Sequence, residues 1–227
     1  MDGNGRWAKQ QGKPRVWGHK NGVTAVREIS EAAAEVEIQY LTLYAFSTEN
    51  WGRPKLEVTA LMSLLVETVK NELKTLLKNN IRLKVIGDIS KLPERSYKAL
   101  LNGIEQTKNN TGLTLILALN YSSRWEITNA VRHIVKEVES GNLTHSDITE
   151  QTVSSYLNTR EVPDPELLIR TSGEQRISNY LLWQIAYTEL YFTDLFWPDF
   201  RKQNFFEAIL DYQNRERRFG KTGEQIK

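Results

Sequence analysis

The sequence predicts an α/β fold in which helices cover both faces of a mostly parallel central sheet. Short and nearly continuous apolar runs alternate with longer stretches of helical periodicity, as in parallel sheets whose strands are joined by helices. The strongest apolar run, LTLILAL at 113–119, is far shorter than a membrane span. No internal repeat, low-complexity tract or linker divides the 227 residues. We therefore expect a single domain over residues 1–227.

The apolar runs give five expected strands. They lie at 40–46, 81–89, 113–121, 166–170 and 189–193. YLTLYAF at 40–46 is typical of a strand that is buried on both faces. Ligands bind beyond the carboxyl ends of parallel strands, and polar segments with hydroxyl and arginine side chains follow three of these runs. We expect those segments, 47–54, 121–124 and 170–178, to meet at one rim suited to anions.

Helical periodicity fills the intervals between the strands. Apolar residues recur from Val23 to Val36, and Pro54 stands at the first position of a long helix whose apolar stripe runs from Val58 to Leu76. Further helices are expected at about 93–108, 124–139 and 204–218, the last with a basic end. Thr149 is placed to cap a short helix.

The amino-acid composition excludes several kinds of functional site. The chain has no cysteine, which excludes disulfides, thiolate metal sites and a cysteine nucleophile, and suits a reducing cytosol. The net charge is only +2, so the overall charge makes no case for nucleic acid. The three histidines show no metal-ligand spacing, and only His19 lies among basic residues that could bind phosphate.

The first residues, MDGNGRWA, form a glycine loop that leads into a basic segment. GNGRWA fits the dinucleotide fingerprint formally, but no strand precedes it in the sequence, and Gly12-Lys13-Pro14 does not complete a Walker A motif. Backbone N–H groups together with Arg6, Arg15 and His19 would suit a diphosphate. Composition alone leaves a solvated basic terminus as an equal alternative.

Two acids and one tryptophan are further candidates. Asp2 could hold Mg²⁺ against a diphosphate, although an isolated aspartate is more often a surface residue. Glu189 lies among apolar neighbours in AYTELYF, where plain strand alternation is the simpler explanation. Trp51 follows a strand beside Asn50 and Arg53 and could line a site, whereas Trp183 and Trp197 are expected in the core.

Several segments in order resemble the cis-prenyltransferases, with the greatest likeness to the bacterial undecaprenyl diphosphate synthases. They are MDGNGRWA, GHKNG, LTLYAFSTENWGRP, NNTGLTL, IRTSGEQRISNYLLWQIAYTELYFTDLFWPDF and RERRFG, and they run from Met1 to about Gly220. The resemblance implies repeated Mg²⁺-dependent condensation of isopentenyl diphosphate onto farnesyl diphosphate, giving an undecaprenyl lipid-carrier precursor for cell-wall polysaccharide. It also implies a cytoplasmic homodimer with peripheral membrane contact through its lipid product.

The same resemblance assigns roles to individual residues. Asp2 matches the essential aspartate that handles metal and diphosphate, and Glu189 matches a second metal ligand. The site for the allylic diphosphate is matched by Gly3, Asn4, Gly5, Arg6, Trp7, Arg15 and His19. The catalytic loop is matched by Ser47, Thr48, Glu49, Asn50, Trp51 and Arg53, among which Asn50 and Arg53 are expected to be catalytic. The clamp for isopentenyl diphosphate is matched by Arg170, Arg176 and Ser178, and a C-terminal motif that completes the site across a dimer by Arg218 and Gly220.

The resemblance further implies an apolar tunnel for the growing chain, walled by the stripe from Val58 to Leu76 and closed near Leu113. Members of the family carry a first strand upstream of the aspartate. We therefore expect that Met1 is an internal methionine of a longer natural chain and that this strand is missing here.

Two other functions stay open from the sequence. A non-catalytic dimer partner of a cis-prenyltransferase would share the fold, although such partners tend to lose the catalytic aspartate and loop residues that are present here. A basic RNA-binding module using Arg6, Trp7 and the RERR segment would instead bind nucleic acid with an affinity that falls steeply with salt.

Overall fold

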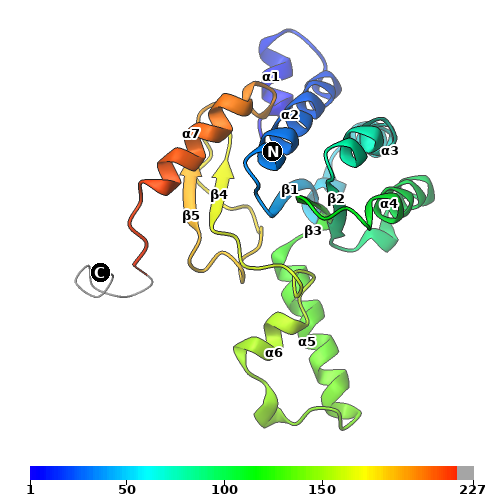
Figure 1. Cartoon of the computed structure of the whole chain (residues 1–227). Helices are drawn as coiled ribbons and strands as arrows, with labels where there is room; N and C mark the ends of the chain where they lie inside the picture. The colour runs from blue at the N-terminus through cyan, green and yellow to red at the C-terminus, as the bar shows by residue number, and fades with distance from the viewer. Residues whose placement is uncertain (219–227) are drawn as a thin grey trace.

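The computed structural model describes residues 1–218, in which helices surround two small parallel sheets (Figure 1). β1 (Tyr40–Ser47), β3 (Thr114–Tyr121) and β2 (Arg82–Ile86) form the first sheet in that order. β4 (Leu167–Arg170) and β5 (Glu189–Phe192) form the second. All of these pairings are parallel, so the predicted α/β class is confirmed, but the strands form two sheets and not one.

The helices occupy the intervals that periodicity indicated, with two corrections. They are α1 (Asn4–Gln10), α2 (Arg15–Glu35), α3 (Lys55–Lys78), α4 (Glu94–Thr107), α5 (Ser123–Glu139), α6 (Glu150–Ser155) and α7 (Lys202–Gln213), with short 3₁₀ turns η1 (Thr48–Gly52), η2 (Ile89–Lys91), η3 (His145–Asp147) and η4 (Trp197–Asp199). α2 begins at Arg15 and not at Val23, because its first two turns bury Gly18 and Gly22 in place of apolar side chains. α7 ends at Gln213 and not at Arg218, because Arg215 turns back to pair with Glu189.

The core lies on both faces of β3, whose eight residues are all buried. Leu115, Leu117 and Leu119 pack with residues of α2 and α3 in the larger apolar cluster. Ile116 and Ala118 face a second cluster on the opposite side of the sheet. Burial on both faces explains why this strand is so clearly predicted from its continuous apolar run.

A buried carboxylate fixes the segment that follows β4. Glu126 of α5 is 1% exposed and accepts hydrogen bonds from Tyr121 Oη (2.5 Å), Asn158 N (2.8 Å) and Gln184 Nε2 (3.0 Å). These donors come from three separate parts of the chain, so Glu126 holds β3, the segment after α6 and the segment after β4 together. The shared acceptor is costly to bury and is stable here because its oxygens are satisfied.

α1 lies directly against α2 because two glycines let the backbones approach. A Cβ on Gly18 would lie 1.9 Å from Asn4 O, and one on Gly22 would lie 2.3 Å from Asn4 Oδ1. Trp197 secures the same contact, since its indole Nε1 donates to Gly22 O (2.9 Å) and its backbone N donates to Asp2 O (2.9 Å). The position of Asp2 is therefore set by the packing of α1, α2 and η4.

α5 and α6 extend away from the two sheets (Figure 1). As predicted, Thr149 caps α6, because its side chain accepts a hydrogen bond from Thr152 N (3.2 Å). Among the helices of residues 1–218, none combines the length and the apolar character needed to cross a membrane.

Candidate active site

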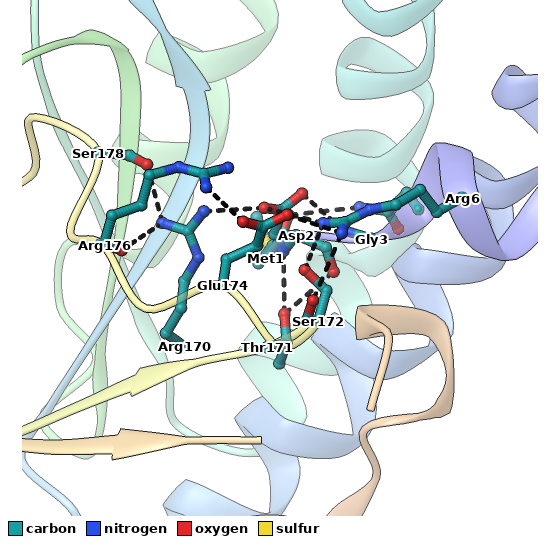
Figure 2. Close-up of polar contacts among 11 residues, drawn as sticks. Met1, Asp2, Gly3, Arg6, Arg170, Thr171, Ser172, Glu174, Arg176 and Ser178 are labelled. Carbon is teal, nitrogen blue, oxygen red and sulfur yellow. Dashed lines mark hydrogen bonds and ion pairs between the residues drawn. The ribbon is translucent and has the colours of Figure 1, made fainter. Parts of the chain in front are cut away.

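Asp2 lies where the segment before α1 meets the end of β4 (Figure 2). Its backbone is fixed by Thr171, whose hydroxyl accepts from Asp2 N (3.1 Å) and donates to Asp2 O (3.0 Å). Its carboxylate accepts from Gly3 N (2.7 Å) at Oδ1 and from Arg170 Nη2 (2.8 Å) at Oδ2. Strand β4 thus delivers Arg170 and Thr171 to the aspartate, as the strand-end rule predicts.

Gly3 allows the tight approach around Asp2. Its φ of 96° lies in the left-handed region, which glycine adopts without strain. A Cβ at this position would lie 2.5 Å from a ring carbon of Phe196 and 3.0 Å from Ser172 Cβ. The resemblance-based assignment of Gly3 to the site therefore has a steric basis in this fold.

Three arginines converge beside Asp2, and two of them are bridged by an acid that the sequence analysis did not select (Figure 2). Arg6 donates to Glu174 Oε1 (2.7 Å) and to Ser172 Oγ (2.6 Å), and Arg176 pairs with the other oxygen of Glu174. Arg170 Nη1 donates to Ser178 Oγ (2.9 Å). The predicted residues Arg6, Arg170, Arg176 and Ser178 are thus brought together, and Arg6 belongs to the same cluster as the predicted isopentenyl clamp.

A second cationic cluster forms between α2 and the start of α3, around another missed acid. Glu57 accepts from Arg15 Nε (3.1 Å) and Arg53 Nη1 (3.2 Å), and His19 Nε2 lies 3.7 Å from the same carboxylate. The Arg15 guanidinium also covers Gly5, where a Cβ would lie 2.7 Å from Arg15 Cζ. Glu57 looks like an ordinary first-turn acid in the sequence, which favours a helix N-terminus by itself.

The segment 47–53 joins β1 to α3 as the turn η1. Its predicted residue Asn50 is turned inward, because Asn50 Oδ1 accepts from Ser47 N (3.2 Å). Thr48 Oγ1 donates to Glu49 Oε2 (3.1 Å), and Trp51 packs edge-on against Phe46 at 5.1 Å between ring centroids. The predicted catalytic loop is therefore an ordered turn at the rim of the first sheet.

Burial and charge set the protonation of two site residues. Burial raises the pKa of Asp2, but the hydrogen bond from Gly3 N–H and the Arg170 guanidinium outweigh it, so the pKa lies below its usual value. Burial, followed by the nearby charge of Arg53, lowers the pKa of His19 to about 4. At neutral pH the site therefore holds an ionised Asp2 and a neutral His19.

A cavity of about 1190 Å³ opens among these residues and continues between the helices and the first sheet. Its polar wall includes Asp2, His19, Asn50, Arg53, Arg170, Arg176 and Ser178. Its apolar wall includes Leu43, Leu61, Leu65, Val69, Leu115, Leu117 and Leu119. The predicted stripe of α3 therefore does line a cavity, while Leu113 is buried in the adjoining core cluster. Charged groups at one side and hydrocarbon at the other suit a ligand with an anionic head and an apolar tail.

Two predicted residues lie away from this rim. Trp7 stacks on Trp17 at 4.6 Å between ring centroids, so it packs α1 on α2. Arg218 pairs with Glu216 on the surface, and Gly220 lies outside the described residues. Asn4, by contrast, is buried under the loop with Nδ2 donating to Met1 O (3.4 Å).

The predicted metal pair of Asp2 and Glu189 is not brought together within one chain. Glu189 begins β5 level with Leu167, whereas Asp2 contacts Arg170, three residues further along β4 and about 10 Å away by strand rise. The Glu189 carboxylate accepts instead from Arg215 (3.0 Å). Within residues 1–218 no group of three or more acids and histidines is arranged to hold a metal. The role of Glu189 stays a prediction.

Comparison with known proteins identifies the family that the sequence resembles. Residues 1–220 match the prenyltransferase family model described as "Putative undecaprenyl diphosphate synthase". The chain is 56% identical over 226 residues to an isoprenyl transferase of Porphyromonas gingivalis, covering 100% of this chain and 89% of that protein. It is 52% identical over 227 residues to the ditrans,polycis-undecaprenyl-diphosphate synthase ((2E,6E)-farnesyl-diphosphate specific) of Vibrio vulnificus, covering 100% of this chain and 90% of that protein.

Among solved structures, a lavandulyl diphosphate synthase from Lavandula x intermedia in complex with dimethylallyl diphosphate superposes with a TM-score of 0.95 at 37% identity. The match covers 97% of this chain and 95% of that one. Sequence and fold agree over nearly the whole length, and the resemblance found in the sequence is confirmed. The chain belongs to the undecaprenyl diphosphate synthase family of cis-prenyltransferases.

Proposed function

We propose that this chain condenses isopentenyl diphosphate repeatedly onto farnesyl diphosphate and makes an undecaprenyl diphosphate with new cis double bonds. The product would serve as the precursor of a lipid carrier for cell-wall polysaccharide. The observation that carries the proposal is the convergence of Asp2, Arg170 and Arg176 at the polar end of a cavity whose other walls are apolar. The farnesyl-specific name of the Vibrio vulnificus relative supports this choice of starter.

The proposed reaction forms a bond between C1 of the allylic substrate and C4 of isopentenyl diphosphate. The bond from C1 to the diphosphate oxygen breaks, and a proton leaves C2 of the isopentenyl unit. Negative charge develops on the departing diphosphate, so fixed guanidinium groups stabilise the transition state. The presence of two cation clusters, one around Glu174 and one around Glu57, supports binding of two diphosphates.

Asn50 and Arg53 are placed to act next to these clusters. Arg53 already belongs to the Glu57 cluster, and both side chains line the cavity. We propose that Arg53 holds a diphosphate and that Asn50, once released from Ser47 N, orients the isopentenyl unit for proton loss. The His19 imidazole, neutral at pH 7, can donate a hydrogen bond to phosphate without adding charge.

Asp2 fits the expected Mg²⁺. Its carboxylate is ionised, 38% of the side chain is exposed toward the cavity, and one or two carboxylates with substrate phosphates are the usual ligands of this ion. When bound, Mg²⁺ would neutralise the leaving diphosphate. Glu189 would join it only if a second chain or a rearrangement brought it to Asp2.

A homodimer and peripheral membrane contact complete the proposal. β5 leaves Leu190 and Phe192 each 38% exposed, an apolar strand face that a second copy could cover. Light scattering after gel filtration should give twice the chain mass of 26.3 kDa.

The direct test of membrane contact is co-sedimentation with liposomes in the presence of both substrates. A chain that stays in the supernatant would contradict the proposed membrane contact.

The test of the activity is incubation with farnesyl diphosphate, labelled isopentenyl diphosphate and Mg²⁺, followed by mass spectrometry of the lipid products. We expect a polyprenyl series that disappears in Asp2→Asn and persists in Asp147→Asn, an exposed aspartate of η3. The absence of any product from the unchanged protein would favour a non-catalytic dimer partner. Salt-sensitive binding to RNA without product would favour the nucleic-acid alternative.

A further inference from the structure

The turn η1 contacts two neighbouring parts of the rim through single side-chain hydrogen bonds. One bond joins Trp51 to Asn120 at the end of β3, and the other joins Glu49 to Asn179 after β4. Both partners are asparagines that the sequence analysis did not select. Their contacts lie on either side of Asn50, the residue proposed to orient the isopentenyl unit.

The side chain of Asn120 is buried and held by hydrogen bonds at both ends of its amide group. It is 3% exposed, its Nδ2 donates to Asp88 O (2.8 Å), and its Oδ1 accepts from Trp51 Nε1 (2.7 Å). The amide orientation follows from these two partners, because only the oxygen can accept from the indole. Asn120 therefore presents a fixed acceptor to Trp51.

Asn179 connects η1 to the residues that hold Arg170. Its Nδ2 donates to Glu49 Oε1 (2.8 Å), its Oδ1 accepts from Arg124 N (3.0 Å), and its backbone O accepts from Ser123 N (2.8 Å). The adjacent Ser178 accepts from Arg170 Nη1 (2.9 Å). Asn179 thus touches η1 and the N-terminus of α5, and its neighbour Ser178 holds the arginine clamp.

Both asparagines adopt left-handed backbone conformations, with φ of 46° at Asn120 and 57° at Asn179. Asparagine and aspartate tolerate this region better than other residues that have a Cβ. Such conformations persist where the surroundings over-determine them, and they occur often at functional sites. The backbone here aims each amide at η1.

We propose that Asn120 and Asn179 are positioning residues that dock η1 onto the rim and hold Asn50 and Arg53 toward the cavity. Asn179 also couples the turn to the Arg170 clamp, so that occupancy of one site favours order in the other. This inference rests on the proposed function for its catalytic consequence, whereas the docking itself concerns contacts that can be measured without turnover.

The sharpest variant is Asn179→Asp. It keeps the oxygen that accepts from Arg124 N and keeps tolerance of the left-handed backbone, but it places a carboxylate oxygen against Glu49 Oε1. Adding Glu49→Gln restores a hydrogen bond between the two side chains, now donated by the side chain at position 49 and accepted by the one at position 179. Asn102→Asp is the matched control, because Asn102 is exposed on α4 and its Oδ1 accepts from Gln106.

The measurement is amide hydrogen exchange of peptides covering residues 47–53, together with kcat and KM for isopentenyl diphosphate. We expect Asn179→Asp to speed exchange of this segment about tenfold, as the loss of a hydrogen bond to a charged group would. Its kcat should fall in parallel. The double variant should recover the slow exchange, and Asn102→Asp should change neither the exchange nor kcat.

Unchanged exchange in Asn179→Asp, or faster exchange that the double variant does not reverse, would overturn the docking role. Faster exchange in Asn179→Asp with kcat unchanged would overturn the link between docking and catalysis. If the unchanged protein forms no polyprenyl product, the proposed function fails, and the exchange comparison still decides whether the two asparagines dock η1.

Discussion

Replacing Gly18 by alanine should separate the position of Asp2 from the stability of the fold. The new Cβ would lie 1.9 Å from Asn4 O, about 1.5 Å inside ordinary contact. Alanine gains roughly 0.5–1 kcal/mol over glycine within a helix. Forcing the side chain into a fixed site costs about 1–3 kcal/mol. Since α1 is a short helix of seven residues, we expect α1 to move and α2 to stay.

A shift of α1 by about 1.5 Å would displace Asp2, Gly3 and Arg6 relative to Arg170. Misplacement of reacting groups by 1 Å can cost about a hundredfold in rate. Gly18→Ala should therefore lose about two orders of magnitude in kcat/KM while its unfolding midpoint stays within a few degrees of the unchanged protein. Product formation and thermal unfolding of the same preparation provide both values.

Thr24→Ala is the control for the helix itself. Thr24 is exposed on α2, so this change gains about 0.5 kcal/mol of helix propensity with no new contact. It should leave turnover unchanged. If Gly18→Ala keeps turnover within about threefold and gains stability as Thr24→Ala does, then α1 does not fix the aspartate in the way that the glycine contacts indicate.

Three further outcomes follow from the charges of the site and core. The pKa of His19 is about 4 in the folded chain against an ordinary value of 6.5, so between these pH values the unfolded chain binds one more proton than the folded chain. The free energy of unfolding should therefore fall by about 3 kcal/mol from pH 7 to pH 4 through this residue. The difference in urea unfolding between the unchanged protein and His19→Asn measures this fall. Glu174→Gln should bind inorganic diphosphate about threefold to tenfold more tightly, because Arg6 and Arg176 lose a competing carboxylate. Calorimetry measures the affinity, and equal or weaker binding would show that Glu174 does not compete. Glu126→Ala removes the shared acceptor of three donors, although Gln184 Nε2 keeps a second acceptor in Thr159 Oγ1. The change should cost about 3–5 kcal/mol, a fall of roughly 10 °C in Tm. A fall of under 2 °C would mean that the core relaxes around the loss.

The strands could be predicted from their apolar runs, most clearly where burial on both faces makes such a run continuous. β3 is the clearest case, since all eight of its residues are buried. The first two turns of α2 gave no such signal. Their buried face consists of Gly18 and Gly22, which serve close backbone approach and carry no hydrophobic periodicity. The division of the strands into two sheets was also beyond the sequence, because apolar runs do not specify which strands pair.

The site residues divide in a similar way. Asp2 and Arg170 could be selected because strand ends and a family motif place them at the rim. Glu57 could not, because its partner Arg15 lies 42 residues earlier and the two meet only through the packing of α2 on α3. The polar contacts of Asn120 and Asn179 likewise depend on backbone conformations with positive φ. Asparagine tolerates such a conformation, but its presence in a sequence does not predict one.

The carboxylates at the rim explain how such a cationic site can exist without its ligands. Arg6 and Arg176 share Glu174, and Arg15 and Arg53 share Glu57, so each pair of like charges is bridged by an acid. Without the acids, guanidinium groups this close would repel one another and weaken the fold. Ligand binding is then an exchange of anions, in which a singly charged carboxylate yields to a diphosphate that offers more charge and more acceptor oxygens. A monoanion lacks that advantage and should therefore displace the acids less readily. Because Glu174→Gln removes the same competitor and the same repelling charge for every anion, its fold-gain in affinity for inorganic diphosphate should be at least as large as that for a monoanion such as acetate.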